Sequence, residues 1–440
     1  MPRRSSSLLL VAVAIAVILT ACNGAAPPPD DTADDAPAGD ADTDDADDVA
    51  DEDAADPDDG APDAPDVAAR FDEIVEQVAD LRGLPVDAEV PLDVVTSEEL
   101  TEIALADAED DLEQIARSEA VAKALHQIPE DTDLLELNED LIAAGVAGMY
   151  VPEDDQAYVV SDGDGLSPLE QVTVAHEVVH ALQDRYIDLG ILDEFEDDPD
   201  AAMAFSSVIE GDAVRLQEQW AAAHLTEVQR QQRQVEEQQQ VQEQQDTLLS
   251  LPRALLESFV TPYVAGPQFV ATITQDGDPD ALDAALEDPP STMVEVFDPS
   301  LYADGFEPEP VEVGAVPDGY DELASWTSGA FEVALLLELA DGHATSPELL
   351  GSWRGGQLAA FEDGDDVAVA VGWTFADEAT AAQVCEVIPD WHATVADSEP
   401  AGSADTYEGP SDALVVDCDG TDVSYAVGPD VEVARAALGG

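Results

Sequence analysis

Positively charged residues are the scarcest class in this sequence. Lys123 is the single lysine, and twelve arginines accompany it against 101 acidic residues, which gives a formal net charge of −88. A protein that binds nucleic acid needs a basic surface to neutralise phosphate groups. Because the sequence contains no basic stretch, we exclude DNA and RNA as partners.

Long apolar runs are nearly as scarce. The one long stretch made entirely of apolar residues is Leu8–Leu19. This run is too short for a stable membrane span, and two arginines precede it, as in a secretory signal. It ends in Leu19-Thr20-Ala21-Cys22, which matches the lipobox of bacterial lipoproteins. We therefore predict a signal peptide over residues 1–21 and lipidation of Cys22, which would anchor the protein to the bacterial cell membrane outside the cytoplasm. Ordinary secretion with a free Cys22 is the alternative.

Large apolar side chains are almost absent from residues 23–66, which contain eighteen acidic residues and no basic ones. Such a segment cannot bury enough apolar surface to fold, and its like charges extend it. We interpret residues 22–66 as a lipidated cysteine followed by a disordered acidic tether. The chain from residue 67 still carries a formal charge of −72, whose self-repulsion is largely screened at about 1 M salt. A saline habitat is therefore expected.

Histidine is also rare, and two of the six histidines lie in His176-Glu177-Val178-Val179-His180. Residues four apart share one face of a helix, so both imidazoles could take two corners of a tetrahedral zinc site. Glu177 is placed to accept a proton from a zinc-bound water. Ser167-Pro168-Leu169-Glu170 has the form of a capping box with proline at the first helical position, so the helix should begin two turns earlier. The alternative is an amphipathic helix that carries two histidines by chance.

A third protein ligand must come from elsewhere, because the extended motif HExxHxxGxxH is absent and no cysteine is near. Glu210 is our choice, since it stands among small and apolar residues in a predicted helix thirty positions after His180. A glutamate on a second helix would complete a His₂Glu catalytic site with one open position. The rivals Asp188, Glu194 and Glu196 lie in an acidic connector, where solvent exposure explains them.

Spacing along the chain suggests roles for Asp184 and for the remaining histidines. Asp184 follows the second motif histidine by four residues, so it could accept that ring's outward N–H, or it is a solvated surface residue. His126, His343 and His392 have no partners at ligand spacing and are interpreted as structural, and His224 as exposed.

The segment HEVVHALQD followed by IEGDA resembles the gluzincin class of zinc metallopeptidases, the thermolysin-like clan. More narrowly, the chain is similar to a group of bacterial and archaeal surface proteins with the signature HE-x-x-HALQDQ. The resemblance covers about residues 90–390. The further segments that carry it are Gly148–Pro152, Pro262–Gly266, Pro289–Thr292 and Trp353–Gly356. The resemblance implies one zinc ion per chain, a glutamate as third ligand and a peptide or protein substrate.

Three positions depart from the pattern that the resemblance implies. Arg185 stands where glutamine is expected, Asp298 where histidine is expected, and Val214 where thermolysin-like enzymes carry an aspartate. Loss of the histidine would weaken stabilisation of the oxyanion, for which Tyr263 and Tyr302 are the candidates.

The expected fold class is α+β, mainly α. A metallopeptidase-like domain over residues 67–340 should contain helices, a short hairpin that offers an edge strand before the motif helix, and a Gln-rich helix. The helices are expected over 67–82, 97–127 and 133–145, with caps at Thr96-Ser97 and Thr132; the hairpin strands over 149–151 and 157–160; and the Gln-rich helix over about 213–249.

Residues 341–440 are expected to form a small α/β module at the C-terminus. Residues 366–375 and 413–427 alternate as strands do, and residues 378–388 have helical periodicity. Cys385 and Cys418 would form a disulfide in an extracytoplasmic compartment, and two reduced, buried cysteines are the alternative.

Together these features predict a zinc-dependent, metallopeptidase-like lipoprotein at the cell surface. Two other classes stay open at this point. One is an inactive metal-binding or adhesive surface protein, and the other is a metal hydrolase that acts on something other than peptides.

Overall fold

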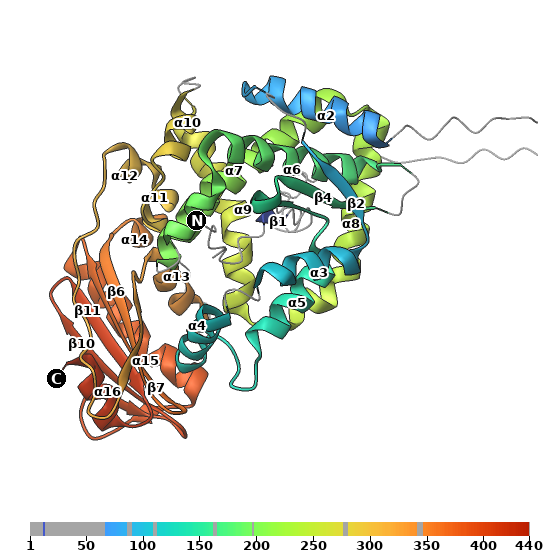
Figure 1. The fold of residues 1–440 in the computed structure, drawn as a ribbon. Coiled ribbons are helices and arrows are strands. Elements are labelled where there is room, and N and C mark those ends of the chain that lie inside the picture. Colours follow the sequence, from blue (N-terminus) through green and yellow to red (C-terminus); the bar gives the residue numbers. More distant parts are fainter. Residues whose placement is uncertain are drawn as a thin grey trace, which may run out of the picture.

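The computed structural model describes residues 12–13, 67–85, 90–108, 112–161, 165–195, 198–275, 280–340 and 346–439. Its content of 60% helix and 17% strand confirms the α+β, mainly α class. Figure 1 shows a lobe of helices, the helical lobe, beside a lobe built on a large sheet, the sheet lobe. The predicted lipidation site Cys22, the tether and all but two residues of the predicted signal peptide lie outside the described residues.

The N-terminal helices largely follow the sequence prediction. They are α2 (Val67–Arg82), α3 (Ser97–Ala108), α4 (Leu112–Ala124) and α5 (Leu134–Gly145). The range 97–127, expected to be helical, contains α3 and α4, and residues 109–111 between them lie outside the described residues. The cap expected at Thr132 is wrong, since Asp133 accepts the first free amides of α5 from Leu135 and Glu136. Aspartate is among the strongest N-cap residues.

A small sheet lies against the motif helix and contains the expected hairpin. Its strand order is β1-β3-β4-β2, with bounds Ala12–Val13, Gly148–Val151, Gln156–Val160 and Leu92–Val95. β3 and β4 pair antiparallel through a short 3₁₀ turn, Pro152–Asp154. β1 pairs antiparallel with the other side of β3. The outer side of β3 is therefore a strand edge that takes a further extended segment.

The core of the helical lobe is made by long helices that follow the hairpin. They are α6 (Pro168–Ile187), α7 (Pro199–His224), α8 (Glu227–Ser250) and α9 (Arg253–Ile273), followed by the shorter α10 (Asp280–Glu287), α11 (Met293–Phe297) and α12 (Pro299–Ala303). The prediction of one continuous Gln-rich helix over about 213–249 is wrong, because two helices, α7 and α8, cover this range. Helix α7 ends with Leu225 as its C-cap, and Thr226 then forms a capping box with Gln229 that starts α8. A Ser/Thr followed three residues later by Gln is a helix-start signal.

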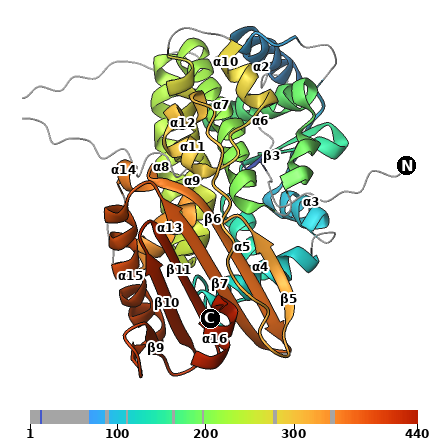
Figure 2. The same ribbon diagram turned by 90° about the vertical axis from the view of Figure 1, so that its left-hand side faces the viewer.

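The sheet lobe has seven antiparallel strands in the order β5-β6-β7-β11-β10-β9-β8 (Figure 2). Their bounds are Asp321–Trp326, Trp353–Asp363, Asp366–Phe375, Asp422–Gly428, Ala413–Asp419, Thr406–Glu408 and Glu399–Pro400. The sheet thus begins with β5, before residue 341, and the predicted strand over 413–427 is a hairpin of β10 and β11. Helices of this lobe are α13 (Ala330–Leu339), α14 (Pro347–Leu350), α15 (Glu378–Ala396) and α16 (Val431–Leu438).

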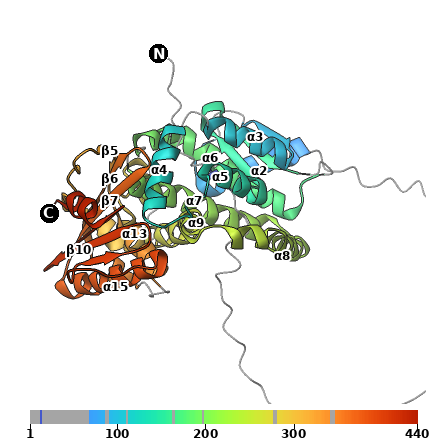
Figure 3. The ribbon, with the colours of Figure 1, turned by 90° about the horizontal axis from the view of Figure 1, so that it is seen from below.

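Alternation along the strands separates the two faces of this sheet. Leu358 and Val371 point into a core with α13, α15 and part of α4, whereas Ala359 and Ala370 point to the opposite face under α16. Figure 3 shows α4 lying between the sheet lobe and the other N-terminal helices. α4 is therefore the element through which the N-terminal part of the chain packs on β7.

The helix α15 and the strand β10 are joined by a disulfide between Cys385 and Cys418. α15 runs past the end expected at Ile388, because Pro389 is accommodated inside the helix. None of the helices in the described ranges combines the length and apolar content that a bilayer crossing requires.

Candidate metal centre

The motif helix α6 forms where the sequence predicts it. The Ser167 side chain accepts the amide of Glu170, and the Glu170 carboxylate accepts the amide of Ser167, with Pro168 at the first helical position. Glu236 of α8 also accepts the free amide of Leu169. The start of α6 is thus fixed locally and by a neighbouring helix, and the motif lies in its buried middle.

The structure brings His176, His180 and Glu210 together, as the sequence predicts. Glu210 Oε2 lies 3.2 Å from His176 Nε2 and 3.7 Å from His180 Nε2. Donor atoms held tetrahedrally about 2.0–2.1 Å from a zinc ion lie roughly 3.3 Å apart, so these separations fit one ion. The two Nε2 atoms and Glu210 Oε2 are buried and make no hydrogen bond. Three orphaned donor atoms that converge in this way could hold a metal ion.

Two glutamines set the orientation of the histidine rings. His176 Nδ1 lies 2.8 Å from Gln217 Oε1, and His180 Nδ1 lies 3.0 Å from Gln183 Oε1. An amide oxygen only accepts, so the ring proton sits on Nδ1 and the lone pair of Nε2 faces Glu210. Gln217 is two helical turns beyond Glu210 on α7, and Gln183 is three residues beyond His180, so each shares a face with the ligand it serves.

Asp184, expected to accept the N–H of a ligand histidine, does not do so. It accepts the Tyr150 hydroxyl at 2.8 Å and the Leu189 amide at 2.8 Å. The fourth position after His180 points toward the hairpin, whereas the third position, Gln183, points toward the ligand ring. Asp184 therefore fixes the end of α6 against β3.

Tyr263 of α9 reaches the metal centre. Its hydroxyl donates to Glu210 Oε1 at 2.9 Å, and its ring stacks on His176 with 6.4 Å between centroids. The second oxyanion candidate, Tyr302, lies elsewhere and donates to the Asp288 carbonyl. Tyr263 thus holds the Glu210 carboxylate in place.

A buried chain of polar contacts extends from the centre to α2. Gln183 Nε2 donates to Asp212 Oδ2 at 3.1 Å, and Arg82 Nε donates to the same oxygen at 2.9 Å. Burial lowers the pKa of Arg82, but Asp212 and Asp283 outweigh it and hold that pKa above its ordinary value. Val214 stands where an aspartate was expected, and Asp212, acting through Gln183, supplies the negative charge behind His180.

Burial controls the protonation of the centre, whose four motif and ligand side chains are at most 3% exposed. It lowers the pKa of His176 and His180 to about 4, so both rings are neutral at pH 7. It raises the pKa of Glu210 to about 7, although His180 and the Tyr263 hydroxyl act in the opposite sense. Burial and the nearby Glu210 raise the pKa of Glu177 well above its usual value, against the backbone N–H of Tyr150.

The remaining carboxylates and histidines that the sequence analysis considered are placed as follows. Asp188 ends α6 with a left-handed φ of 60°, Glu194 lies on the 3₁₀ segment Leu189–Phe195, and Glu196 is outside the described residues. His224 is exposed as expected, and His343 is not described. The interpretation of His126 and His392 as histidines without ligand-spaced partners is wrong, because the fold brings both to Asp412.

Two of the departures have local roles in this fold. Arg185 pairs with Asp155 at 3.0 Å, and Asp298 caps α12 by accepting from Ser300.

No family model, curated protein or solved structure matches the chain.

Proposed function

We propose that this protein is a zinc-dependent metallopeptidase held at the outer face of a bacterial membrane. The observation that carries the proposal is the convergence of the orphaned donor atoms of His176, His180 and Glu210, with Glu177 beside them on α6. Two imidazoles and one carboxylate with a fourth position left for solvent are the ligand type of catalytic zinc sites. Structural zinc sites use four protein ligands instead.

Zinc bound there would supply a Lewis acid for a carbonyl oxygen and lower the pKa of water. The chain's own residues carry the remaining work. Glu177 has a raised pKa because it is buried next to Glu210, which suits a group that takes a proton near neutral pH and returns it to a leaving amine. Gln217 and Gln183 keep the ring protons on the outward nitrogens, and Tyr263 holds Glu210 in position.

The small sheet supports an extended peptide as the substrate. β3 begins at Gly148, where a Cβ would lie 3.1 Å from Glu177 Oε1, so the strand runs beside the proposed base. β1 lies within the predicted signal peptide and pairs with the outer edge of β3. Removal of that peptide would leave the edge free for another extended segment. Addition of a strand to an exposed edge is a common mode of peptide recognition. A substrate in this position would present its backbone to Glu177.

The test is Glu177→Gln in the purified, zinc-loaded protein, with hydrolysis of casein and of a broad peptide library as the measured activity. The variant keeps the size of the side chain but loses the base, so hydrolysis should fall about 10²–10⁴-fold. Zinc content should stay at the wild-type value. Glu243→Gln, on the exposed side of α8, is the matched control and should retain full activity.

Three outcomes would count against the proposal. Equal hydrolysis by Glu177→Gln and wild type would remove Glu177 from the mechanism. Zinc binding without hydrolysis of any peptide would favour a metal-binding surface protein, and turnover of esters alone would favour a non-peptidase hydrolase.

The cellular location rests on the N-terminal sequence. Lipidation at Cys22 would place the helical lobe outside the membrane at the end of an acidic tether, where protein substrates and disulfides occur. Cys22→Ala should abolish incorporation of labelled fatty acid, and unchanged labelling would contradict the assignment.

A further inference from the structure

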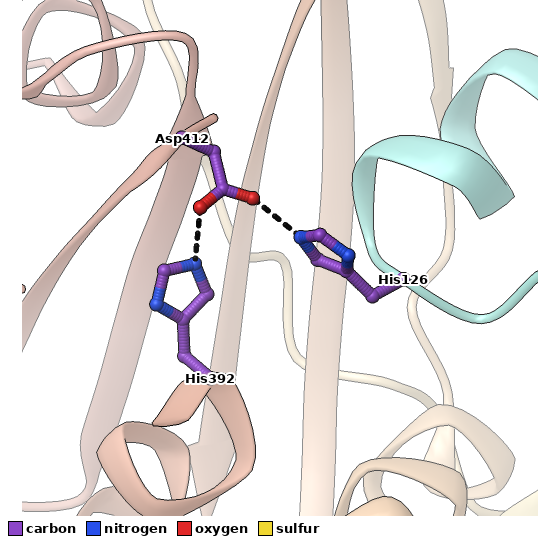
Figure 4. Close-up of side chains that lie close together, drawn as sticks. All are labelled: His126, His392 and Asp412. Atoms are coloured by element: carbon purple, nitrogen blue, oxygen red, sulfur yellow. Dashed lines mark hydrogen bonds and ion pairs between the residues drawn. The ribbon is translucent and has the colours of Figure 1, made fainter. Parts of the chain in front are cut away.

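His126, His392 and Asp412 form a second convergent group, the interlobe cluster, which is remote from the motif helix in the fold. Figure 4 shows one ring nitrogen of each histidine facing a different oxygen of the Asp412 carboxylate. His392 Nε2 lies 3.4 Å from Asp412 Oδ1, and His126 Nε2 contacts Oδ2. The two rings are 6.1 Å apart between centroids and inclined at 75°. All three residues thus direct donor atoms to one place.

The backbone at His126 is shaped for this contact. α4 ends in a Schellman turn, in which the His126 amide bonds to the Lys123 carbonyl and the Gln127 amide to the Ala122 carbonyl. His126 has the left-handed φ of 52° at the position that glycine normally occupies. A histidine here costs more than a glycine would, and its ring is carried onto the sheet lobe.

His392 supplies an independent observation that points to a ligand. It lies on α15 with 0% exposure; its Nδ1 has no hydrogen bond, and its Nε2 makes no hydrogen bond but lies at ion-pair distance, 3.4 Å, from Asp412 Oδ1. Asp412 Oδ1, which it faces, is also buried without a hydrogen bond. Buried polar atoms are nearly always paired, since an unpaired one loses its hydration without replacement. A cation between these atoms would satisfy His392 Nε2 and Asp412 Oδ1 together.

We propose that His126, His392 and Asp412 hold a second divalent cation, zinc or a close relative such as Co²⁺. Two imidazoles and one carboxylate favour zinc-like ions over Ca²⁺ and Mg²⁺, which prefer all-oxygen sites. The 3.4 Å separation of His392 Nε2 and Asp412 Oδ1 fits the edge of a zinc tetrahedron, which is roughly 3.3 Å long. The partial exposure of His126 leaves the fourth position and an entry path to solvent.

The role of this site would be to join the two lobes. His126 follows α4, which comes from the N-terminal half of the chain, whereas His392 and Asp412 belong to the sheet lobe. A bound cation would tie these parts at one point, as the disulfide ties α15 to β10. This inference does not depend on the proposed peptidase activity, because no ligand is shared with the first centre.

A metal-free His–Asp–His hydrogen-bonded triad would use the same three side chains. The two arrangements differ in what removal of a proton acceptor does. Asp412→Asn keeps the shape and one acceptor oxygen, so a triad would largely survive it. A metal site would lose its only anionic ligand, and its zinc affinity should fall at least by the roughly 10–100-fold that loss of a ligand's outer hydrogen-bond partner costs.

The experiment counts zinc in the purified protein after loading and gel filtration. The 101 acidic residues bind cations loosely, so the buffer should contain about 2 M NaCl and excess Mg²⁺ to remove weakly held zinc. We expect about two zinc ions per chain in wild type, about one in His126→Ala and in Asp412→Asn, and about one in His180→Ala. His224→Ala, which changes an exposed histidine, is the control and should retain both.

Co²⁺ titration of His180→Ala isolates the second site and does not depend on the folding of a cluster variant. Visible absorption of tetrahedral cobalt should appear in this variant and disappear when His126→Ala is added, with circular dichroism unchanged. Absence of that absorption, or full zinc retention in His126→Ala and Asp412→Asn, would overturn the second site. If instead His180→Ala left zinc content unchanged while His126→Ala lowered it, the second site would stand and the first centre would fall.

Discussion

Gly211 and Gly266 face each other where α7 crosses α9, and neither position has room for a side chain. A Cβ at Gly266 would lie 2.1 Å from the Ser207 carbonyl oxygen, and one at Gly211 would lie 2.5 Å from Gly266 backbone atoms. Glu210 is adjacent to the first glycine, and Tyr263 is three residues before the second. The close crossing is what brings the Tyr263 hydroxyl to the Glu210 carboxylate.

Gly211→Ala should destabilise the protein although alanine favours helices. In an exposed helix the change would stabilise by about 1 kcal/mol, but here the added methyl group should overpack the crossing at a net cost of about 1–3 kcal/mol. Urea unfolding of the zinc-loaded protein measures this cost. Gln219→Ala, on the exposed side of the same helix, is the control and should change little. A stabilised Gly211→Ala variant would mean that the helices can separate freely.

Gln217→Ala should weaken zinc binding without abolishing it. The Gln217 side chain fixes the proton of His176 on Nδ1, and loss of such a partner typically lowers metal affinity about 10–100-fold. Competition with a chromophoric chelator at constant pH measures the change. Asp184→Asn provides the comparison, because Asp184 touches neither ligand ring through the contacts described, and its zinc affinity should stay near wild type. A larger loss in Asp184→Asn than in Gln217→Ala would mean that Asp184, and not Gln217, supports a histidine of the metal centre.

Zinc affinity should fall as the pH is lowered below about 7. Glu210 has a pKa of about 7 in the metal-free protein, so below that pH a proton must leave before the carboxylate can bind. Each pH unit then costs up to about tenfold in apparent affinity. Near pH 4 the slope should steepen, because His176 and His180 also become protonated there.

Tyr263→Phe sharpens this pH test. The Tyr263 hydroxyl stabilises the charged form of Glu210, so its removal should raise the pKa of Glu210 and move the break to higher pH. Zinc affinities measured from about pH 5.5 to about pH 8.5 cover the change of slope near pH 7 in the wild type and the shifted one in Tyr263→Phe. An affinity that does not vary with pH across this range would show that Glu210 is already ionised and that its burial is incomplete in solution.

The stability of the folded part should rise with salt. Residues from 67 onward carry a formal charge of −72, and their repulsion acts over about 10 Å at 0.1 M salt but only about 3 Å at 1 M. The midpoint of thermal unfolding should therefore increase with NaCl when zinc is saturating throughout. A midpoint that is constant from low to molar NaCl would remove the physical basis for a saline habitat.

The sequence was most informative where structure is determined locally. Ser167 and Glu170 mark the start of α6, and the spacing of His176 and His180 places both rings on one face, because a helix repeats every 3.6 residues. Thr226 and Gln229 form an equally local start signal for α8, which a prediction based on glutamine content alone overlooked. Neither pattern needs knowledge of the tertiary fold.

Contacts between distant segments could not be predicted in this way. His126 and Asp412 are 286 positions apart, and only the packing of α4 on the sheet lobe brings them together. Strand β6 carries Gly355 and Gly356, which weaken a strand signal. In the fold a Cβ at Gly356 would lie 2.2 Å from the Ser328 carbonyl oxygen, so the glycine is required by a backbone that the sequence alone does not locate.

The long helix α7 belongs to both lobes. At its start, Asp198 accepts the Thr327 hydroxyl at 2.7 Å just beyond β5, and Asp200 accepts the Met293 amide at 3.0 Å. Farther along the same helix, Glu210 and Gln217 enter the metal centre. Because one continuous rod is anchored at both ends, the lobes should melt as a single cooperative unit, and calorimetry should record one transition with equal calorimetric and van't Hoff enthalpies. Neither the metal centre nor the sheet is then expected to fold when it is expressed without the other.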